Sequence, residues 1–367
     1  MYELAKRTDL VIVGCTLGNL VHAHYAASKG LNVVVVEKQA EVGGAWRVER
    51  GVFGSDVECA AHFFQSSLNP QSVAALEQLG AEFISVPVTK WHVRFCKKSF
   101  LISDFKAKLF IEFKSLTLSL AGFCLARIRA QEFVRLSKDR FKNIAFLFCK
   151  YRDATVYFRG GVQPFLERLL KRLEILGVEF IKDKVKTIDI KNGEALVSCE
   201  NYSLISKHIS LTRRSLLEKV SIGSDVFTLD EQFVVRRQVF LLVEDRKQEL
   251  NFYVRRSHNC GFFAVSNLSL IENFTDPEGR VLLVVTLEDM SAKAPELSGE
   301  HVMGMLRKHK VLSPDVKLVG SHCARYEDAR SSQDTLEQIC SDVKNIELEE
   351  SLDFAPWVND IVSRYQA

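Results

Sequence analysis

No two cysteines of this 367-residue sequence have the Cys-x-x-Cys spacing of zinc and redox motifs, although the sequence contains nine cysteines. Because the nine are scattered, we expect reduced, buried thiols rather than a disulfide framework or a zinc site. His22 and His24 stand two apart on an expected helix, so they point to different faces. The sequence therefore predicts no bound metal.

Long apolar runs are also missing. No stretch of 18 apolar residues occurs, which argues against a transmembrane helix. The first apolar run begins at Leu10 and stops at Gly14, which is too short for the apolar region of a secretory signal peptide. We therefore expect a cytoplasmic protein. The sequence has no GxSxG, HExxH, Walker or EF-hand pattern, so those enzyme and ion-binding classes have no support.

The N-terminal region has the pattern of a βαβ unit. Residues 10–13 form a short apolar run before Gly14, as expected of a strand buried on both faces. A helical pattern follows over Gly18–Lys29, and Gly30 ends it. Residues 32–37 then contain four consecutive valines, which predicts a second buried parallel strand. These elements predict a dinucleotide-type fold, with a plain α/β unit as the alternative.

The turn after the first strand departs from the Gly-x-Gly-x-x-Gly fingerprint of dinucleotide-binding domains. Its three glycine positions are occupied by Gly14, Thr16 and Asn19, with an additional Gly18. Gly14 retains the residue of the tight turn. Thr16 places a branched side chain where a phosphate usually lies, and Asn19 is expected to hinder close packing unless Gly18 replaces it.

An acidic residue stands where a ribose would be bound. Glu37 ends the second strand, 23 residues after Gly14, which is the position of the carboxylate that accepts hydrogen bonds from ribose hydroxyls. A carboxylate at this position favours the unphosphorylated ribose of FAD or NAD over that of NADP. No second glycine fingerprint for NADPH is present, which argues against a flavin monooxygenase.

The charge distribution is uneven. The whole sequence has a net charge of +3, but Lys90–Lys150 contains fourteen Lys and Arg and four acids, a local net of about +10 among many phenylalanines. This segment is expected to be an inserted lobe. It could bind an anionic substrate, lie on an anionic membrane surface through a helix over Lys114–Arg129, or form an ordinary solvated surface. Nucleic-acid binding is not expected, because no recognition module accompanies the charge.

Further elements follow downstream. After Gly160 and Gly161 the sequence predicts a helix with Phe165, Leu166 and Leu169 on one face, followed by strands. The predicted elements after residue 212 are strands at 234–243, 251–254, 261–266 and 281–286, and a helix over 299–308. Pro356 is expected to stand in the first turn of a C-terminal helix.

Several of these segments resemble the FAD-binding superfamily of amine oxidases, protoporphyrinogen oxidases, phytoene desaturases and UDP-galactopyranose mutases. The resemblance rests on Glu37, on the pair Gly43-Gly44, and on ECAAH from Glu58 to His62, where Ala60 replaces a glycine. Residues 69–83 and 160–185 are similar to the helix that enters the substrate lobe and to the returning FAD-domain segment. Unlike family members, the chain has no glycine after Gly320.

The resemblance implies FAD as cofactor and a set of residues that bind it. Arg47 would pair with the pyrophosphate, Val185 would meet the adenine with its backbone, and Trp46 would line the pocket or pack in the core. His62 is the candidate catalytic residue, with a structural histidine as the alternative. The implied FAD contacts are Gly14, Thr16, Leu17, Gly18, Glu37, Lys38, Gly43, Gly44, Ala45, Trp46, Arg47, Ala61, Val185, Trp357, Val358 and Asn359.

The predicted fold is α/β, a Rossmann-like FAD/NAD(P)-binding domain with an inserted substrate (cap) domain. Residues 1–88, 155–212 and 345–367 would form the first domain, and 89–154 with 213–344 the second. The implied function is an FAD-dependent oxidoreductase in which a small-molecule substrate, which could be anionic, transfers a hydride to flavin. A nucleotide-sugar enzyme like UDP-galactopyranose mutase and a non-catalytic scaffold are the alternatives.

Overall fold

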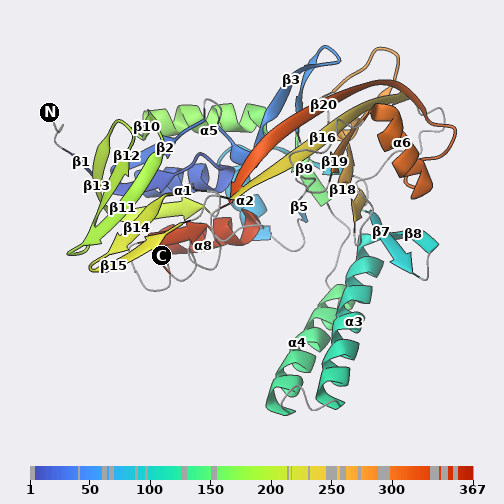
Figure 1. Ribbon diagram of the computed structural model, residues 1–367, viewed down its shortest axis with the longest axis horizontal. Coiled ribbons are helices and arrows are strands. Elements are labelled where there is room, and N and C mark those ends of the chain that lie inside the picture. The colour runs from blue at the N-terminus through green and yellow to red at the C-terminus, as the bar shows by residue number, and fades with distance from the viewer. Residues whose placement is uncertain are drawn as a thin grey trace.

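The computed structural model describes most of the chain. The described residues are 5–39, 42–59, 64–65, 70–86, 90–95, 98–124, 130–149, 155–212, 215, 217–229, 232–244, 254–256, 262–271, 274–287, 298–330, 339, 346–349 and 354–366. They form two large sheets, two small sheets and several helices (Figure 1).

The N-terminal residues form the predicted βαβ unit. Strand β1 spans Lys6–Val13, helix α1 spans Leu17–Ser28, and β2 spans Val33–Glu37. The two strands pair in parallel, and the apolar residues of both are almost fully buried. The helix ends where Gly30 adopts a φ of +83°, a conformation that glycine adopts without strain. The predicted unit is therefore confirmed.

This unit lies in a nine-stranded sheet. Its order is β10-β2-β1-β13-β12-β11-β14-β15, and β21 also pairs with β13. Strands β14 and β15, which the predicted domain division places in the substrate domain, join this sheet through parallel pairing of β14 with β11. The bounds are β10 Glu179–Lys182, β11 Val185–Lys191, β12 Glu194–Cys199, β13 Ser203–Thr212, β14 Lys219–Ile222, β15 Asp225–Thr228 and β21 Ile346–Glu349.

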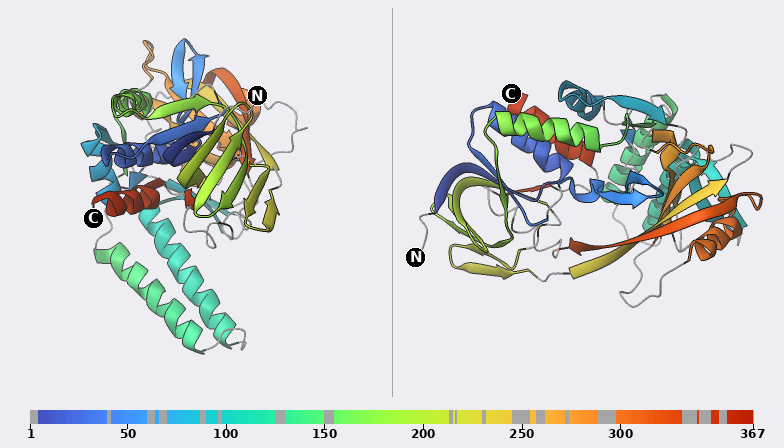
Figure 2. Two further views of the ribbon diagram at one scale, coloured as in Figure 1. Left: turned by 90° about the vertical axis from the view of Figure 1, so that its left-hand side faces the viewer. Right: turned by 90° about the horizontal axis from the view of Figure 1, so that it is seen from above.

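Three helices pack side by side on one face of β1 and β2. Helix α1 lies between α5 (Gln163–Ile175) and α8 (Phe354–Gln366), as Figures 1 and 2 show. Helix α2 (Pro70–Gln78) contacts α8. The apolar residues between them and the sheet belong to one buried cluster, while Val11, Val13, Val34 and Val36 face a second cluster on the other side. Burial on both faces explains the unbroken valine run.

The second large sheet has the order β20-β16-β19-β18-β17-β7-β8. Strands from both insertions share it, because β7 pairs in parallel with β17. Helix α6 (Gly299–Lys308) packs on the face that carries Val239 and Leu241. The bounds are β7 Lys90–Phe95, β8 Lys98–Ser103, β16 Gln232–Glu244, β17 Val254–Arg256, β18 Phe262–Asn267, β19 Val281–Leu287 and β20 Lys317–Arg330, and the 3-10 helix η2 spans Leu268–Ile271.

Smaller elements link the two sheets. The hairpin β3–β4 (Val48–Val52 and Ser55–Glu58) reaches β20, where His322 Nε2 lies 3.1 Å from Glu49 Oε1. Gly320 allows the hairpin to approach β20 closely, because a Cβ at this position would lie 2.8 Å from Cε1 of Phe53, in the turn between β3 and β4. A three-stranded sheet has the order β5-β9-β6, with bounds Phe64–Gln65, Thr155–Phe158 and Phe83–Val86.

A helical hairpin projects away from both large sheets (Figures 1 and 2). It consists of α3 (Asp104–Cys124) and α4 (Ala130–Cys149), and the start of α3 touches β7 and β8. Within the described residues, no helix is both long and apolar enough to cross a bilayer.

The predicted downstream elements are largely confirmed. Helix α6 has the predicted bounds, Pro356 stands in the first turn of α8, and β16, β18 and β19 lie within two residues of the predictions. Residues 251–253 of the strand predicted at 251–254 lie outside the described residues. The helix predicted over 114–129 instead begins at Asp104 and is described to Cys124. The 14-residue strand β20 was missed, because its polar composition does not alternate clearly with apolar residues.

Two glycines of α6 give opposite predictions. A Cβ at Gly299 would overlap the Cβ of Ser321, whereas a Cβ at Gly304 would meet nothing within 4 Å. We expect Gly299→Ala to lower the free energy of unfolding by about 1–3 kcal/mol through overpacking. Gly304→Ala should raise it by up to about 1 kcal/mol, because alanine favours the helix. Urea unfolding of both variants measures the difference, and equal effects would contradict the packing of α6 on β20.

Candidate functional site

Three parallel strands end at one edge of the nine-stranded sheet. Strand β1 pairs in parallel with both β2 and β13, so Gly14, Glu37 and Thr212 follow neighbouring carboxyl ends. Ligands of open α/β sheets bind beyond the carboxyl ends of the strands. This edge is therefore the candidate functional site.

The loop after β1 leads directly into the N-terminus of α1. Gly14 has a φ of +96°, which favours glycine, although a Cβ there would meet only Thr212 at 3.9 Å. Thr16 is the N-cap, and its Oγ1 accepts a hydrogen bond from the Asn19 N–H at 3.2 Å. Among the described residues, the N–H groups of Leu17 and Gly18 have no hydrogen-bond partner. Such first-turn donors can bind an anion, while the Leu17 side chain is buried in the core.

The expectation that the Asn19 side chain hinders packing is wrong. The side chain is completely buried, and Nδ2 donates to the carbonyl oxygens of Gly14 at 2.8 Å and Val13 at 3.3 Å. Ser215 Oγ also donates to the Val13 oxygen, at 3.2 Å. The amide thus satisfies carbonyl groups that the turn exposes, and it replaces the close contact of a glycine with hydrogen bonds.

Glu37 binds the loop backbone. Its Oε2 accepts from the Cys15 N–H at 2.7 Å, and its Oε1 accepts from the Gln39 N–H at 2.8 Å. A carboxylate has about four acceptor sites, so capacity for further donors remains. Burial, with a contribution from the nearby Glu37 charge, raises the pKa of the Cys15 thiol far above its usual range, so this thiol is neutral.

The Gly43-Gly44 pair lies against this loop. The Gly43 N–H donates to the Cys15 oxygen at 2.8 Å, and Gly43 forms an isolated parallel bridge with Thr16. Both glycines have positive φ values, +106° and +61°. A Cβ on Gly44 would lie 3.2 Å from Cγ2 of Thr16, and one on Gly43 would lie 3.0 Å from Cδ1 of Leu166. Glycine is thus required both by conformation and by close approach.

The residues after this pair divide between core and surface. Ala45 lies in the 3-10 helix η1 (Gly44–Trp46). Trp46 is 6% exposed and stacks on Tyr157, with ring centroids 6.2 Å apart, so its side chain is part of the core. Arg47 is half-buried beside the loop, and its carbonyl accepts from the Cys59 N–H at 3.0 Å. The predicted pairing of Arg47 with a pyrophosphate stays a prediction.

A buried carboxylate, Glu58, connects these segments to α5. It is 2% exposed and accepts hydrogen bonds from the Tyr157 hydroxyl and from the Val162 N–H at the N-cap of α5. Burial raises its pKa to about 7, and these two hydrogen bonds oppose the rise. The sequence singled out Glu58 as part of a resemblance, but burial and partners depend on tertiary contacts.

Other predicted FAD contacts lie further along the same fold. Lys38 is exposed directly after β2. Val185 begins β11, and its side chain is buried with the second core cluster. Trp357, Val358 and Asn359 lie in the first two turns of α8, where Val358 is completely buried. The predicted catalytic residue His62 and the predicted contact Ala61 lie outside the described residues, as does Ala60.

Gln238 is one of several buried polar residues on the second large sheet, and it was not predicted from the sequence. Gln238 is 3% exposed on β16, and within the described part of the chain its Oε1 has no hydrogen-bond partner. Its cross-strand neighbours are Thr286 and Ala324, and the next residues on the same face, Phe240 and Leu242, join the core cluster that also contains α1. An unpartnered buried amide is a candidate substrate contact. Its isolated sequence position carries no motif.

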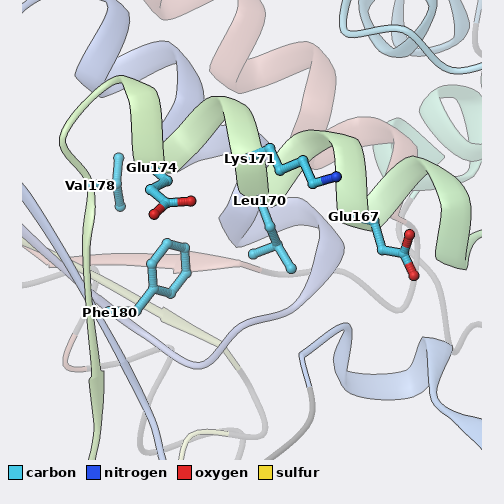
Figure 3. A pocket seen from close by; sticks show the side chains of 6 residues that line it. All are labelled: Glu167, Leu170, Lys171, Glu174, Val178 and Phe180. Carbon is cyan, nitrogen blue, oxygen red and sulfur yellow. The ribbon is translucent and has the colours of Figure 1, made fainter.

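A surface depression lies elsewhere, on the outer face of α5 (Figure 3). Its floor is apolar and its rim is charged, and it borders the edge strand β10. The lining residues are Glu167, Leu170, Lys171, Glu174, Val178 and Phe180. The residues of α5 that face α1 are a different set, including Phe165 and Leu169, so this depression is separate from the loop. Among the described residues, no cluster of three or more His, Cys, Asp or Glu is arranged for a metal ion.

Comparison with known proteins identifies the class of the N-terminal unit. Residues 12–79 match the family model of the NAD(P)-binding Rossmann-like domain. No curated protein matches the sequence. The N-terminal unit is therefore similar to Rossmann-like NAD(P)-binding domains.

Solved structures extend the likeness to nearly the whole chain. Putrescine oxidase bound to putrescine matches with a TM-score of 0.61 and 14% identity over 99% of both chains. A protein of Exiguobacterium sp. 255-15, provisionally named protoporphyrinogen oxidase, matches with a TM-score of 0.59 and 14% identity, covering 99% of this chain and 98% of that chain. Rab GDI from Plasmodium falciparum matches with a TM-score of 0.57 and 12% identity, over 99% and 98%. The fold predicted from the resemblance to amine oxidases and protoporphyrinogen oxidases is confirmed.

The buried Glu58 predicts a specific pH dependence of stability. Its pKa is 4.5 when exposed and about 7 in the folded protein, so folding binds a proton between these values. Its contribution to stability is fully present below pH 4.5 and is lost as pH rises through 7, a change of roughly 3 kcal/mol. Glu58→Gln removes this change. We expect the unfolding free energy of the variant, relative to wild type, to rise by that amount between roughly pH 5 and pH 8.

Denaturant unfolding at the two pH values measures this difference, and all other titrating groups are common to both proteins. Glu82→Gln is the matched control, because Glu82 is an exposed carboxylate that pairs with Arg159, and arginine stays charged throughout this range. A stability difference between wild type and Glu58→Gln that stays constant over this range would show that Glu58 is not buried as described.

Proposed function

We propose that the protein is an FAD-dependent oxidoreductase acting on a small-molecule substrate. The observation that carries the proposal is Glu37, a carboxylate at the end of β2 whose described partners are the neutral N–H groups of Cys15 and Gln39. It stands beside the positive-φ turn at Gly14 and the first turn of α1. These are the two binding elements of a dinucleotide site, one for ribose and one for phosphate.

The residues present fit an unphosphorylated dinucleotide. The negative charge of Glu37 would accept ribose hydroxyls and repel a 2′-phosphate, which favours FAD or NAD over NADP. The N–H groups of Leu17 and Gly18 point from a helix N-terminus, so they would donate to the pyrophosphate. The close contact of Gly43-Gly44 with Thr16 would hold this loop in place.

When bound, FAD would supply the hydride acceptor, and the chain would supply binding and orientation. The proposal of FAD over NAD draws on the whole-chain likeness to putrescine oxidase and to the Exiguobacterium protein. In this chain Gln238 lies on the face of the second large sheet whose Phe240 and Leu242 belong to the core cluster shared with α1, and its buried carbonyl would accept a hydrogen bond from a substrate N–H or O–H group.

A non-catalytic scaffold is the second candidate function. It is favoured by the Asn19 amide, which occupies a glycine position of the fingerprint and is hydrogen-bonded entirely within the chain. Rab GDI has a similar fold and is not named as an oxidase. The two candidates differ in one directly measurable property, the binding of a dinucleotide.

The first test is the visible absorbance spectrum of the purified protein, together with mass identification of whatever heat denaturation releases. We expect a flavin spectrum and released FAD. Glu37→Gln should weaken FAD binding by about tenfold or more, because a charge-assisted hydrogen bond is lost. Titration of the apoprotein with FAD, followed by flavin fluorescence, measures the affinity.

Glu179→Gln on the neighbouring strand β10 is the matched control, because that carboxylate is exposed and pairs with Lys6. Its FAD affinity should equal that of the wild type. A colourless protein that binds neither FAD nor NAD when each is added would overturn the oxidoreductase proposal and leave the scaffold.

A further inference from the structure

The outward surface of the α3–α4 hairpin is unusually apolar. Twelve large apolar residues of the described chain are conspicuously exposed, and five of them lie on this hairpin although it forms a small part of the molecule. They are Phe113 at 49%, Leu118 at 62%, Leu120 at 50%, Val134 at 63% and Phe141 at 58%. Exposed apolar residues that gather on one element mark an interaction surface.

The exposed side of α3 carries several large apolar residues, whereas a charged residue lies on its more buried side. Its outward residues include Phe113, Leu118 and Leu120, while Glu112 and Ser119 lie on its more buried side. Glu112 is paired there with Arg140 of α4, with Nη1 and Oε2 3.2 Å apart. A helix that faces water normally shows the opposite arrangement, with its charged residues outward.

Two hydroxyl groups of α3 donate to carbonyl groups of its own backbone. Thr117, on the exposed side, donates from Oγ1 to the Phe113 carbonyl at 2.9 Å, and Ser119 donates to the Ser115 carbonyl at 2.9 Å. Residues 115–124 contain no charged side chain. Burial of a polar group costs little when its hydrogen bond is already made, so this face can leave water at low cost.

Cations flank the apolar residues. Lys114 on α3 and Arg135 and Lys138 on α4 are exposed, and residues 104–149 contain nine Lys and Arg against four acids, a net charge of about +5. A second copy of this hairpin would bring two positive surfaces together, which is unfavourable. An anionic lipid surface offers both a complementary charge and an apolar interior.

We propose that the α3–α4 hairpin binds the surface of an anionic lipid bilayer. The hairpin lies in the interface, with its apolar side chains among the upper acyl chains and its lysines and arginines at the phosphate groups. Its projection away from both sheets lets it reach a bilayer without a clash from the rest of the molecule (Figures 1 and 2). The helix α3 has 21 residues and is about 30 Å long, which gives an extended contact.

The test is cosedimentation of the full-length protein with vesicles of phosphatidylcholine, with and without phosphatidylserine, over a range of salt concentrations. We expect binding to the vesicles that contain phosphatidylserine, weakening as salt increases. The double variant Leu118→Asp/Leu120→Asp should reduce the partition coefficient by at least about tenfold. The triple variant Lys114→Gln/Arg135→Gln/Lys138→Gln should reduce it by at least about tenfold and flatten the salt dependence.

The matched control is Ile175→Asp/Val226→Asp, which makes the same change in charge at exposed apolar positions outside the hairpin. It should bind like the wild type, and circular dichroism verifies that all variants are folded. Loss of binding in the control, or no binding to phosphatidylserine vesicles at low salt, would overturn the proposal. The proposal would also be overturned if the wild type were a dimer, and if Leu118→Asp/Leu120→Asp converted it to a monomer without changing vesicle binding.

Two native cysteines provide an independent measurement. Cys124 ends α3 and Cys323 lies on β20, and both are exposed. Phosphatidylserine vesicles should slow the reaction of Cys124 with a polar maleimide, as followed by peptide mass spectrometry, and leave that of Cys323 unchanged. Equal rates at Cys124 with and without vesicles would contradict the proposed contact.

Discussion

The candidate site depends on how the carboxyl end of β1 is capped. The carbonyl oxygens of Val13 and Gly14 accept hydrogen bonds from the Asn19 amide, and Ser215 adds a second donor to Val13. Parallel strands expose such carbonyl groups at one edge, and buried polar groups must find partners. The turn lacks two glycines of the fingerprint, whose positions Thr16 and Asn19 occupy. Side-chain hydrogen bonds therefore hold the turn in place of the close packing that these glycines would allow.

The same edge combines groups with different electrostatic preferences. The first turn of α1 presents N–H donors and the positive end of a helix, which suits an anion. Glu37, one strand away, is an acceptor of hydroxyl and N–H donors. The proposed phosphate-binding and ribose-binding elements therefore lie side by side at the junction of β1 and β2. The Gly43-Gly44 segment holds the loop between them from the other side.

The hairpin presents a second constraint, independent of the sheet edge. In a helix pair the charged and hydroxyl groups usually face water, but here the Glu112–Arg140 ion pair and Ser119 lie toward the inside. Apolar side chains that face outward beside lysines and arginines favour an environment that is both apolar and anionic. The local charge pattern of 90–150 indicated an unusual lobe with three alternative interpretations, and the outward residues of each helix support the proposed membrane contact.

The sequence by itself determined the βαβ unit, because valine runs buried on both faces and a glycine turn have few alternative structures. It also placed α6 and the C-terminal helix, and it pointed to Glu37 through its spacing from Gly14 and to Gly43-Gly44 through the family resemblance. Only the tertiary structure decided what Glu58 does, because its partners Tyr157 and Val162 come from a segment about 100 residues away. The role of Asn19 depended on the folded turn, because its amide donates to the carbonyl groups of Val13 and Gly14 only in that conformation. Likewise, α3 was only partly predicted, because local periodicity shows which residues share a helix face but not which face meets the neighbouring helix.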